Sequence, residues 1–198
     1  MRPTDPDVRQ PSAPHVGCGC SHGSAPGGER GAFRARLPAG HVLATLMDEH
    51  ANMLGLLDQL AGLAAKLPAE GSMVFARIES LGRQLLSAEP HHQREERVLF
   101  PALRERGITG PPDAMTNEHV GLRALKHEVV DLAAKATMGA RVDDSLRQAV
   151  GELVDMLRNH IAKEDGILYP MALETIPEPE WTGLKQQCDA VGYCCGHH

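Results

Sequence analysis

The chain carries an internal repeat in which residues of one half recur 69 positions later, with no gap in the alignment of the halves. The recurring residues are Glu49-His50 with Glu118-His119, His91 with His160, Glu95 with Glu164, and Leu99-Phe100-Pro101 with Leu168-Tyr169-Pro170. Each half therefore holds one His followed by a His-x-x-x-Glu motif. The repeat restricts the fold to two similar halves, and each half is predicted to be a helical hairpin.

Apolar residues recur every three or four positions in four stretches that Gly and Pro separate, which is the pattern of amphipathic helices. The predicted helices cover residues 41–64, about 72–106, about 113–138 and about 142–173, and a short helix is predicted around Trp181. Aromatic residues are only 3% of the chain, which disfavours a β-rich fold. We therefore expect an all-α fold, an antiparallel up-down four-helix bundle. Pro90 lies inside the second helix and predicts a kink or bulge at residues 86–90.

The ends of the chain differ in composition from its middle. Residues 1–40 are rich in Gly, Pro and Ser without periodicity, so we expect a flexible N-terminal tail. Residues 41–173 form the predicted bundle, and residues 174–198 form a short C-terminal extension with a Cys/His tail. All five cysteines lie outside the bundle, at Cys18, Cys20, Cys188, Cys194 and Cys195. These tails could bind a soft metal or exchange disulfides, or they could hold no site.

Charge and hydropathy exclude several classes of partner. The formal net charge is −6, whereas a nucleic-acid-binding protein needs a basic surface, so we expect no nucleic-acid partner. No apolar run has the length of a membrane span, and we expect no membrane partner. The first ten residues lack the apolar core of a secretory signal, and an odd number of cysteines outside the core suits reducing conditions. We expect a cytoplasmic protein.

Ionisable side chains interrupt the apolar faces of the predicted helices. Because residues i and i+4 lie on one face of a helix, each His-x-x-x-Glu motif directs an imidazole and a carboxylate to the same point. A buried carboxylate without a partner costs several kcal/mol, and a metal ion is one such partner. The candidate metal ligands are His50, His91, Glu95, His119, His160 and Glu164. Six ligands are too many for one zinc ion and suit two ions bridged by carboxylates. Imidazole and carboxylate ligands without thiolate favour iron or manganese over copper.

Neighbouring residues offer a second register, because His92 and Glu96 have the same spacing as His91 and Glu95. The repeat places Ile161 opposite His92, so the shared register is His91 with Glu95. We expect His92 and Glu96 either to contact the ligands or to lie at the surface. The remaining polar residues are assigned as follows: His41 and His127 at the surface or rim, and Glu49, Glu118 and Arg123 either as partners of the ligand imidazoles or as solvated side chains.

These motifs together resemble the hemerythrin-like family, also called the HHE cation-binding domain, over residues 41–173. The resemblance implies a four-helix bundle around a non-haem di-iron centre with an oxo or hydroxo bridge. It implies His50, His91, His119 and His160 as terminal ligands, and Glu95 and Glu164 as bridging carboxylates. Arg123 stands where oxygen-carrying hemerythrins have a fifth histidine, and His-x-x-x-Glu replaces their His-x4-Asp. The six-ligand set is closer to bacterial proteins that repair iron–sulfur centres, which usually carry a separate cysteine-containing N-terminal domain.

The resemblance leads to two hypotheses about function. In the first, the di-iron centre binds or reacts with O₂, NO or peroxide in oxidative or nitrosative stress defence or in repair of iron–sulfur centres, and an iron–sulfur protein is a possible partner. In the second, the chain is an iron or oxygen sensor, or an iron-storage module, without turnover. Steady consumption of a substrate would distinguish the first hypothesis from the second. The sequence leaves open whether the chain is an enzyme.

Overall fold

The computed structural model describes residues 26–68 and 72–193, and within these residues every regular element is a helix. The elements are α1 (Pro26–Arg36), α2 (Val42–Ala64), α3 (Ser72–Ser87), α4 (Glu89–Arg94), the π-helix η1 (Glu95–Leu99), α5 (Phe100–Arg104), α6 (Gly110–Thr137), α7 (Asp143–Lys163), the π-helix η2 (Glu164–Leu168), α8 (Tyr169–Thr175), the 3₁₀-helix η3 (Glu178–Glu180) and α9 (Trp181–Val191). The all-helical class predicted from the sequence is confirmed.

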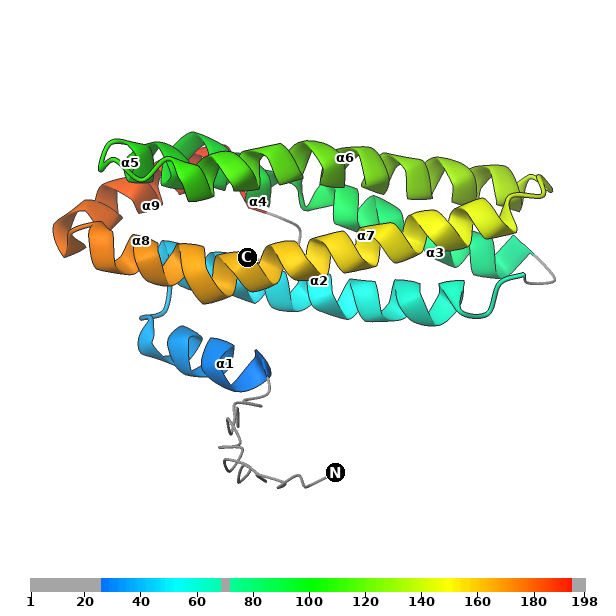
Figure 1. Cartoon of the computed structure of the whole chain (residues 1–198), viewed down its shortest axis with the longest axis horizontal. Helices are drawn as coiled ribbons and strands as arrows, with labels where there is room; N and C mark the ends of the chain where they lie inside the picture. Colours follow the sequence, from blue (N-terminus) through cyan, green and yellow to red (C-terminus); the bar gives the residue numbers. More distant parts are fainter. Residues whose placement is uncertain (1–25, 69–71, 194–198) are drawn as a thin grey trace, which may run out of the picture.

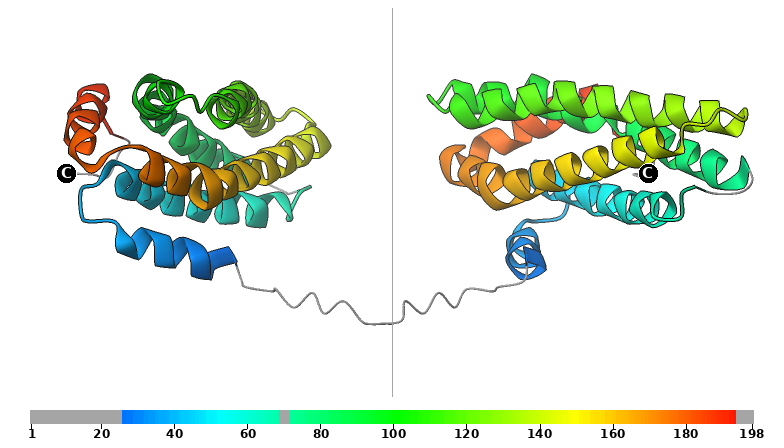
Figure 2. Two further views of the ribbon diagram at one scale, coloured as in Figure 1. Left: turned by 60° about the vertical axis from the view of Figure 1, so that its left-hand side comes forward. Right: turned by 45° about the vertical axis from the view of Figure 1, so that its right-hand side comes forward.

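Four long helical segments lie along the length of the molecule (Figure 1). They are α2, the run from α3 to α5, α6, and the run from α7 to α8, and each packs against others in this set. Helix α1 lies outside the four segments, and α9 lies across one end of them against α2 and α4 (Figure 2). No helix among the described residues combines the length and the apolar character needed to cross a membrane.

The apolar interior is divided into two clusters along this length. The larger cluster includes Met53, Leu57, Leu81, Leu122 and Leu153, and the smaller one includes Met47, Leu99, Phe100, Met115 and Tyr169. His50 lies on α2 between Met47 and Met53, and His119 lies on α6 between Met115 and Leu122. The polar residues of the repeat therefore occupy a layer between two water-excluding clusters.

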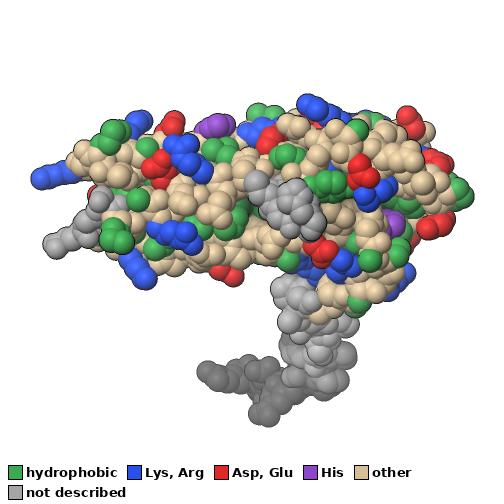
Figure 3. Space-filling view, turned by 180° about the vertical axis from the view of Figure 1, so that it is seen from behind, with side chains coloured by type: hydrophobic (Ala, Val, Ile, Leu, Met, Phe, Trp, Pro, Cys, Tyr) green, Lys and Arg blue, Asp and Glu red, His purple; other side chains and the backbone are tan. Residues whose placement is uncertain are grey.

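At the surface, acidic and basic side chains are interspersed over the face in Figure 3.

Both halves of the repeat contain a π-helical turn at the same position. The turn η1 begins at Glu95 and η2 begins at Glu164, and each turn interrupts a longer α-helical run. A π-turn places one more residue in the turn than an α-helix does, and such turns occur frequently at functional sites. The apolar periodicity predicted uninterrupted helices through both positions. The π-turns therefore begin at the motif glutamate in each half of the repeat.

The helix that contains Pro90 is interrupted where the sequence predicted a distortion. Helix α3 ends at Ser87 and α4 begins at Glu89, with Pro90 in its first turn. Proline is tolerated there because backbone N–H groups in the first turn of a helix have no acceptor within the helix. The amide of His91 bonds to the carbonyl of Ala88, three residues back rather than four. The equivalent residue in the second half, Asn159, lies inside the continuous helix α7. The predicted distortion at residues 86–90 is confirmed.

The N-terminal end of the described chain is more ordered than the sequence suggested, and the C-terminal end contains the predicted helix. Residues 26–36, which were expected to be part of a flexible tail, form α1, because Phe33 packs against the smaller apolar cluster and Arg34 pairs with Asp48 at 2.6 Å. The short helix predicted around Trp181 is α9, and it buries Trp181 and Cys188. Cys18, Cys20, Cys194 and Cys195 lie outside the described residues.

Candidate metal centre

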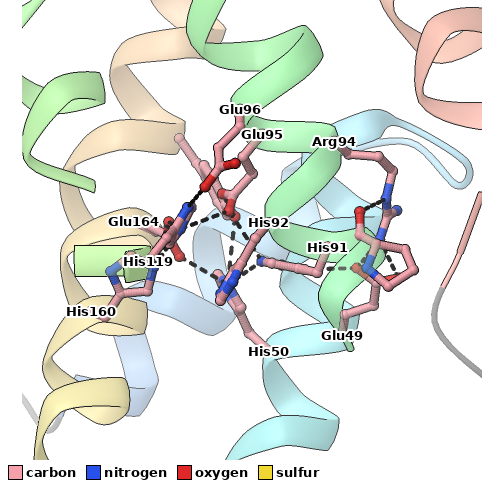
Figure 4. A network of polar contacts seen from close by, with 12 residues as sticks. Glu49, His50, His91, His92, Arg94, Glu95, Glu96, His119, His160 and Glu164 are labelled. Carbon is pink, nitrogen blue, oxygen red and sulfur yellow. Dashed lines mark hydrogen bonds and ion pairs between the residues drawn. The ribbon is translucent and has the colours of Figure 1, made fainter. Parts of the chain in front are cut away.

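The structure brings the six predicted ligands into one buried layer, although they come from six separate elements (Figure 4). The contributions are His50 from α2, His91 from α4, Glu95 from η1, His119 from α6, His160 from α7 and Glu164 from η2. None of the six residues is more than 1% exposed. The repeat thus identified side chains that meet in space, at the level where the two apolar clusters face each other.

Each of the four imidazoles has a carboxylate partner at its outer nitrogen. The Nδ1···O distances are 2.8 Å for His50 with Asp165, 2.8 Å for His91 with Glu49, 2.7 Å for His119 with Glu96, and 2.9 Å for His160 with Glu118. A carboxylate can only accept, so each Nδ1–H donates, and the ring is fixed in the tautomer whose Nε2 carries a lone pair. Carboxylate partners of this kind orient metal-binding histidines in proteins.

The inward Nε2 atoms meet in two pairs. His50 and His91 bring their Nε2 atoms to 3.0 Å, and those of His119 and His160 lie 3.1 Å apart. Two lone pairs at this distance repel unless a cation lies between them. Two ligand atoms at right angles, each about 2.1 Å from one metal ion, are also about 3 Å apart. Burial opposes a charge on His50, but the carboxylates of Asp165 and Glu164 raise its pKa to about 9. Burial in turn lowers the pKa of His91 to about 4.

The two motif glutamates lie between these imidazole pairs. Oε2 of Glu164 is 3.1 Å from Nε2 of His50, and its Oε1 is 3.0 Å from Nε2 of His160. Oε2 of Glu95 is 3.6 Å from Nε2 of His91 and 3.5 Å from Nε2 of His119. Each glutamate therefore faces both pairs.

These glutamate oxygens lack hydrogen-bond partners. Oε2 of Glu95 and both carboxylate oxygens of Glu164 are buried and have no hydrogen-bond donor. Burial and the charge of Glu164 raise the pKa of Glu95 well above its usual range. Burial also opposes ionisation of Glu164, but the facing imidazoles, above all His160, hold its pKa well below its usual range. Unpartnered buried oxygens facing imidazole lone pairs fit a site for metal cations.

The carboxylates that hold the imidazoles are themselves paired with Arg or Lys side chains. Only some of these ion pairs have an equivalent in the other half of the repeat. Glu49 contacts Arg94, and Glu118 contacts Lys163, which is the repeat equivalent of Arg94. Glu96 contacts Arg123 at 2.9 Å. Asp165, the equivalent of Glu96, contacts Arg30, which comes from α1 and has no repeat counterpart in this role. Glu49, Glu118 and Arg123 therefore support the imidazoles, one of the two alternatives that the sequence analysis left open for them.

Three polar residues near the centre, Asp165, Tyr169 and Arg30, were not predicted from the sequence to contact it. Asp165 could have been found, because it follows Glu164 as Glu96 follows Glu95. The Tyr169 hydroxyl donates to Oε1 of Glu95 at 2.7 Å and lies 3.5 Å from Nε2 of His50, while the repeat places Phe100 in the other half. Burial and Glu95 together raise the pKa of Tyr169 well above its usual range, so the phenol stays protonated. Arg30 gave no signal, because it lies in the segment expected to be a tail.

Two histidines lie deeper than the sequence suggested. His41 was expected at the surface or rim, but it is buried against Trp181, and its Nδ1 accepts from the amide of Leu43 as the cap of α2. Burial lowers the pKa of His41 and keeps the ring neutral for this role. His92 is buried beside the centre, and burial, followed by the nearby Lys126, lowers its pKa well below the usual range. His127 is exposed, as expected.

The fold and the site define a helical protein that offers imidazole and carboxylate ligands to metal cations. The family model of the hemerythrin HHE cation-binding domain matches residues 41–172, which is most of the chain. The chain belongs to this family, as the resemblance of its motifs indicated.

Several curated bacterial proteins are similar to the chain over this region. The iron–sulfur cluster repair protein YtfE of Cronobacter sakazakii is 30% identical over 143 residues, which are 67% of this chain and 63% of that protein. The protein of the same name from an Enterobacter species is 26% identical over 144 residues, which are 67% of this chain and 64% of that protein. The protein from Citrobacter koseri is 25% identical, with the same coverage of 67% and 64%. The matched region thus spans a little less than two thirds of these relatives.

Proposed function

We propose that this chain is a non-haem di-iron protein, built as an antiparallel up-down four-helix bundle, in which His50, His91, Glu95, His119, His160 and Glu164 hold two iron ions. The proposal rests on two pairs of imidazoles whose Nε2 atoms lie 3.0 and 3.1 Å apart. Glutamate oxygens without hydrogen-bond partners lie between the two pairs. Membership of a cation-binding family supports the metal, and the donor set without thiolate supports iron.

The geometry favours one ion at each imidazole pair. His50 and His91 would hold one ion, and His119 and His160 would hold the other. Glu164 directs a different oxygen to each pair, at 3.1 and 3.0 Å, which is the arrangement of a bridging carboxylate. Glu95 directs Oε2 to both pairs, at 3.6 and 3.5 Å. Because each glutamate would serve both ions, loss of either glutamate should reduce metal binding more than loss of one imidazole.

We propose that the centre reacts with NO, peroxide or O₂, and that the chain takes part in repair of iron–sulfur centres under oxidative or nitrosative stress. The relatives named as iron–sulfur cluster repair proteins support this role, and they make a damaged iron–sulfur protein the expected partner. The iron pair would supply the redox chemistry. The chain supplies four imidazoles held by carboxylates, a layer closed to water by apolar clusters, and the Tyr169 hydroxyl as a fixed hydrogen-bond donor.

A sensor or iron-storage module without turnover is the second candidate, and the buried unpartnered carboxylates favour it. Such carboxylates destabilise the metal-free bundle, so metal binding is coupled to folding and reports the availability of iron. The two candidates share the same centre and differ only in whether a substrate is consumed or a partner is repaired.

The test begins with the metal content of the full-length protein, measured by mass spectrometry of the metals together with Mössbauer spectroscopy. We expect about two iron ions per chain, and fewer than one in Glu95→Gln. Glu96→Gln is the matched control for the register, because Glu96 holds Nδ1 of His119 and contacts Arg123 but does not face the inward Nε2 atoms, and this variant should keep more iron than Glu95→Gln. A protein that holds a single zinc ion after growth with abundant iron would contradict the proposal.

The second part of the test measures repair. An iron–sulfur enzyme inactivated with NO is incubated with the iron-loaded protein, with the Glu95→Gln variant, or with free iron at the same concentration. Faster recovery with the iron-loaded protein alone supports repair. If recovery never exceeds the free-iron control while the centre holds two irons, the role in repair is excluded and the sensor or storage function remains.

A further inference from the structure

His92 is a buried imidazole at a position where the other half of the repeat has an apolar side chain. It is 1% exposed, and its equivalent in the second half is Ile161, which packs in the larger apolar cluster. The six ligands assigned from the repeat, by contrast, have chemical equivalents in both halves. An apolar residue would fill this position without the cost of burying a polar ring. This difference between the halves is the first indication that the His92 imidazole binds something.

The contacts of His92 direct it to one half of the centre. Its ring stacks on that of His119, with centroids 3.9 Å apart and an interplanar angle of 13°, and meets the ring of His160 edge-on at 5.9 Å. Nitrogen atoms of these three imidazoles lie within 4.8 Å of one another, so the three rings form one candidate group of metal ligands. His91, the preceding residue, contacts His50 in the other pair instead. Consecutive residues of α4 thus face different imidazole pairs.

His92 also lacks the kind of partner that fixes the other four rings. Its Nδ1 is buried without a hydrogen-bond partner, and the closest carboxylate oxygen, Oε2 of Glu89, is 3.7 Å away. Each ligand imidazole of the repeat donates Nδ1–H to a carboxylate at 2.9 Å or less. A buried imidazole that makes no such bond, next to two inward-facing lone pairs, has unsatisfied ligand capacity.

We propose that His92 is a third imidazole ligand of the ion held by His119 and His160, so that the two ions of the centre are inequivalent. The inference rests on the proposed function, in that it requires two metal ions. Three imidazoles and two carboxylates would leave the His119–His160 ion fewer free positions than the His50–His91 ion, and the Tyr169 hydroxyl lies on the His50–His91 side of the centre. An incoming small molecule would therefore find its binding position at the His50–His91 ion.

The experiment compares the iron-loaded full-length protein with variants of His92. His92→Ile introduces the residue that the repeat places at position 161, and His92→Phe keeps a flat ring that can stack on His119 but has no nitrogen. His127→Phe is the matched control, because His127 is an exposed histidine on α6. For each protein we measure iron per chain, the rate of iron transfer to a chelator, and the Mössbauer spectrum of the oxidised centre.

We expect two unequal quadrupole doublets of the same area from the wild type and from the His127 variant. In both His92 variants the doublets should converge, and half of the iron should leave at least about tenfold faster. If His92→Phe keeps the wild-type doublets and release rates, His92 only stacks on His119 and the inference is wrong. If the wild type itself does not bind two irons, the proposed function fails, and the outcome for His92 is separate from that failure.

A reciprocal variant decides the question if the His92 variants do not fold. Ile161→His places an imidazole at the equivalent position of the other half, facing His50 and His91 by the symmetry of the repeat. We expect this variant to shift the doublet of the His50–His91 ion toward that of the His119–His160 ion. It should also slow iron release from the faster site. Unchanged doublets with full iron occupancy in Ile161→His would contradict the inference.

Discussion

Arg94 and Lys163 occupy equivalent positions of the repeat but lie in different surroundings, and this difference predicts unequal effects of the same substitution. The Arg94 side chain is 1% exposed, and its guanidinium contacts both oxygens of Glu49, one of them at 2.5 Å. Its Nε donates to the carbonyl of Pro90 at 3.1 Å. Lys163 contacts Glu118 in the same way, but its side chain is 42% exposed.

Replacement of Arg94 by Met should destabilise the protein far more than replacement of Lys163 by Met. Without Arg94, the Glu49 carboxylate stays buried at 3% exposure and keeps the hydrogen bond from His91, and breaking a buried ion pair in this way costs about 3–5 kcal/mol. An exposed pair such as Lys163 with Glu118 contributes about 0–1 kcal/mol. For a chain of this length, 1 kcal/mol corresponds to about 2–4 °C in Tm, so Arg94→Met should lower Tm by roughly 10 °C.

The assay is thermal unfolding of the full-length, iron-loaded protein, followed by circular dichroism. The double variant Glu49→Gln with Arg94→Met supplies the internal control, because it removes the buried charge along with its partner and should recover part of the lost stability. Equal losses of Tm from Arg94→Met and Lys163→Met, or a double variant less stable than Arg94→Met alone, would refute the reasoning that burial decides the cost.

Three further perturbations test other parts of the structure. Arg30→Ala removes the cation that pairs with Asp165 and should speed iron release to a chelator about tenfold, whereas Arg34→Ala, in the same helix, should leave the rate unchanged. Burial lowers the pKa of His41, so the stability that the neutral ring contributes above pH 6.5 is lost as the pH falls toward and through the lowered pKa. In urea unfolding, His41→Asn should therefore lose less stability than the wild type between about pH 7.5 and 5. Burial raises the pKa of Cys188 to about 11, so peptide-resolved alkylation at about pH 8 should label it only after the protein is denatured.

The residues that meet at the centre could be predicted because the repeat is a stronger constraint than any single motif. An offset of 69 residues, shared by His91 with His160 and Glu95 with Glu164, selects one register from two possible ones. The same offset relates Glu96 to Asp165, so the carboxylate that holds His50 was within reach of the same argument. A single His-x-x-x-Glu spacing would have left the register open.

Other features could not be predicted, for identifiable physical reasons. A π-turn adds one residue to one turn, and the apolar steps of three and four on either side of Glu95 and Glu164 are compatible with both forms of helix. The role of Arg30 depends on a contact with Asp165, 135 positions away in a segment whose composition suggests a tail. Burial of His92 was obscured by its neighbour His91, because adjacent positions on an α-helix point about 100° apart and only one of them matched the repeat.

The departures from the repeat bear on function more directly than the repeat itself. Identical halves would hold two identical ions, and neither ion would be distinguished as the place where a small molecule binds. Two departures lie at the centre, and each adds a polar group to one imidazole pair only. His92 stands where the second half has Ile161 and contacts the His119–His160 pair, whereas Tyr169 stands where the first half has Phe100 and contacts His50 and Glu95. One pair therefore gains an imidazole nitrogen, which favours a metal ion, and the other gains a hydroxyl, which donates to the Glu95 carboxylate beside it. The ligand positions follow from the repeat, and the asymmetry of the site follows from these two positions where the repeat is broken.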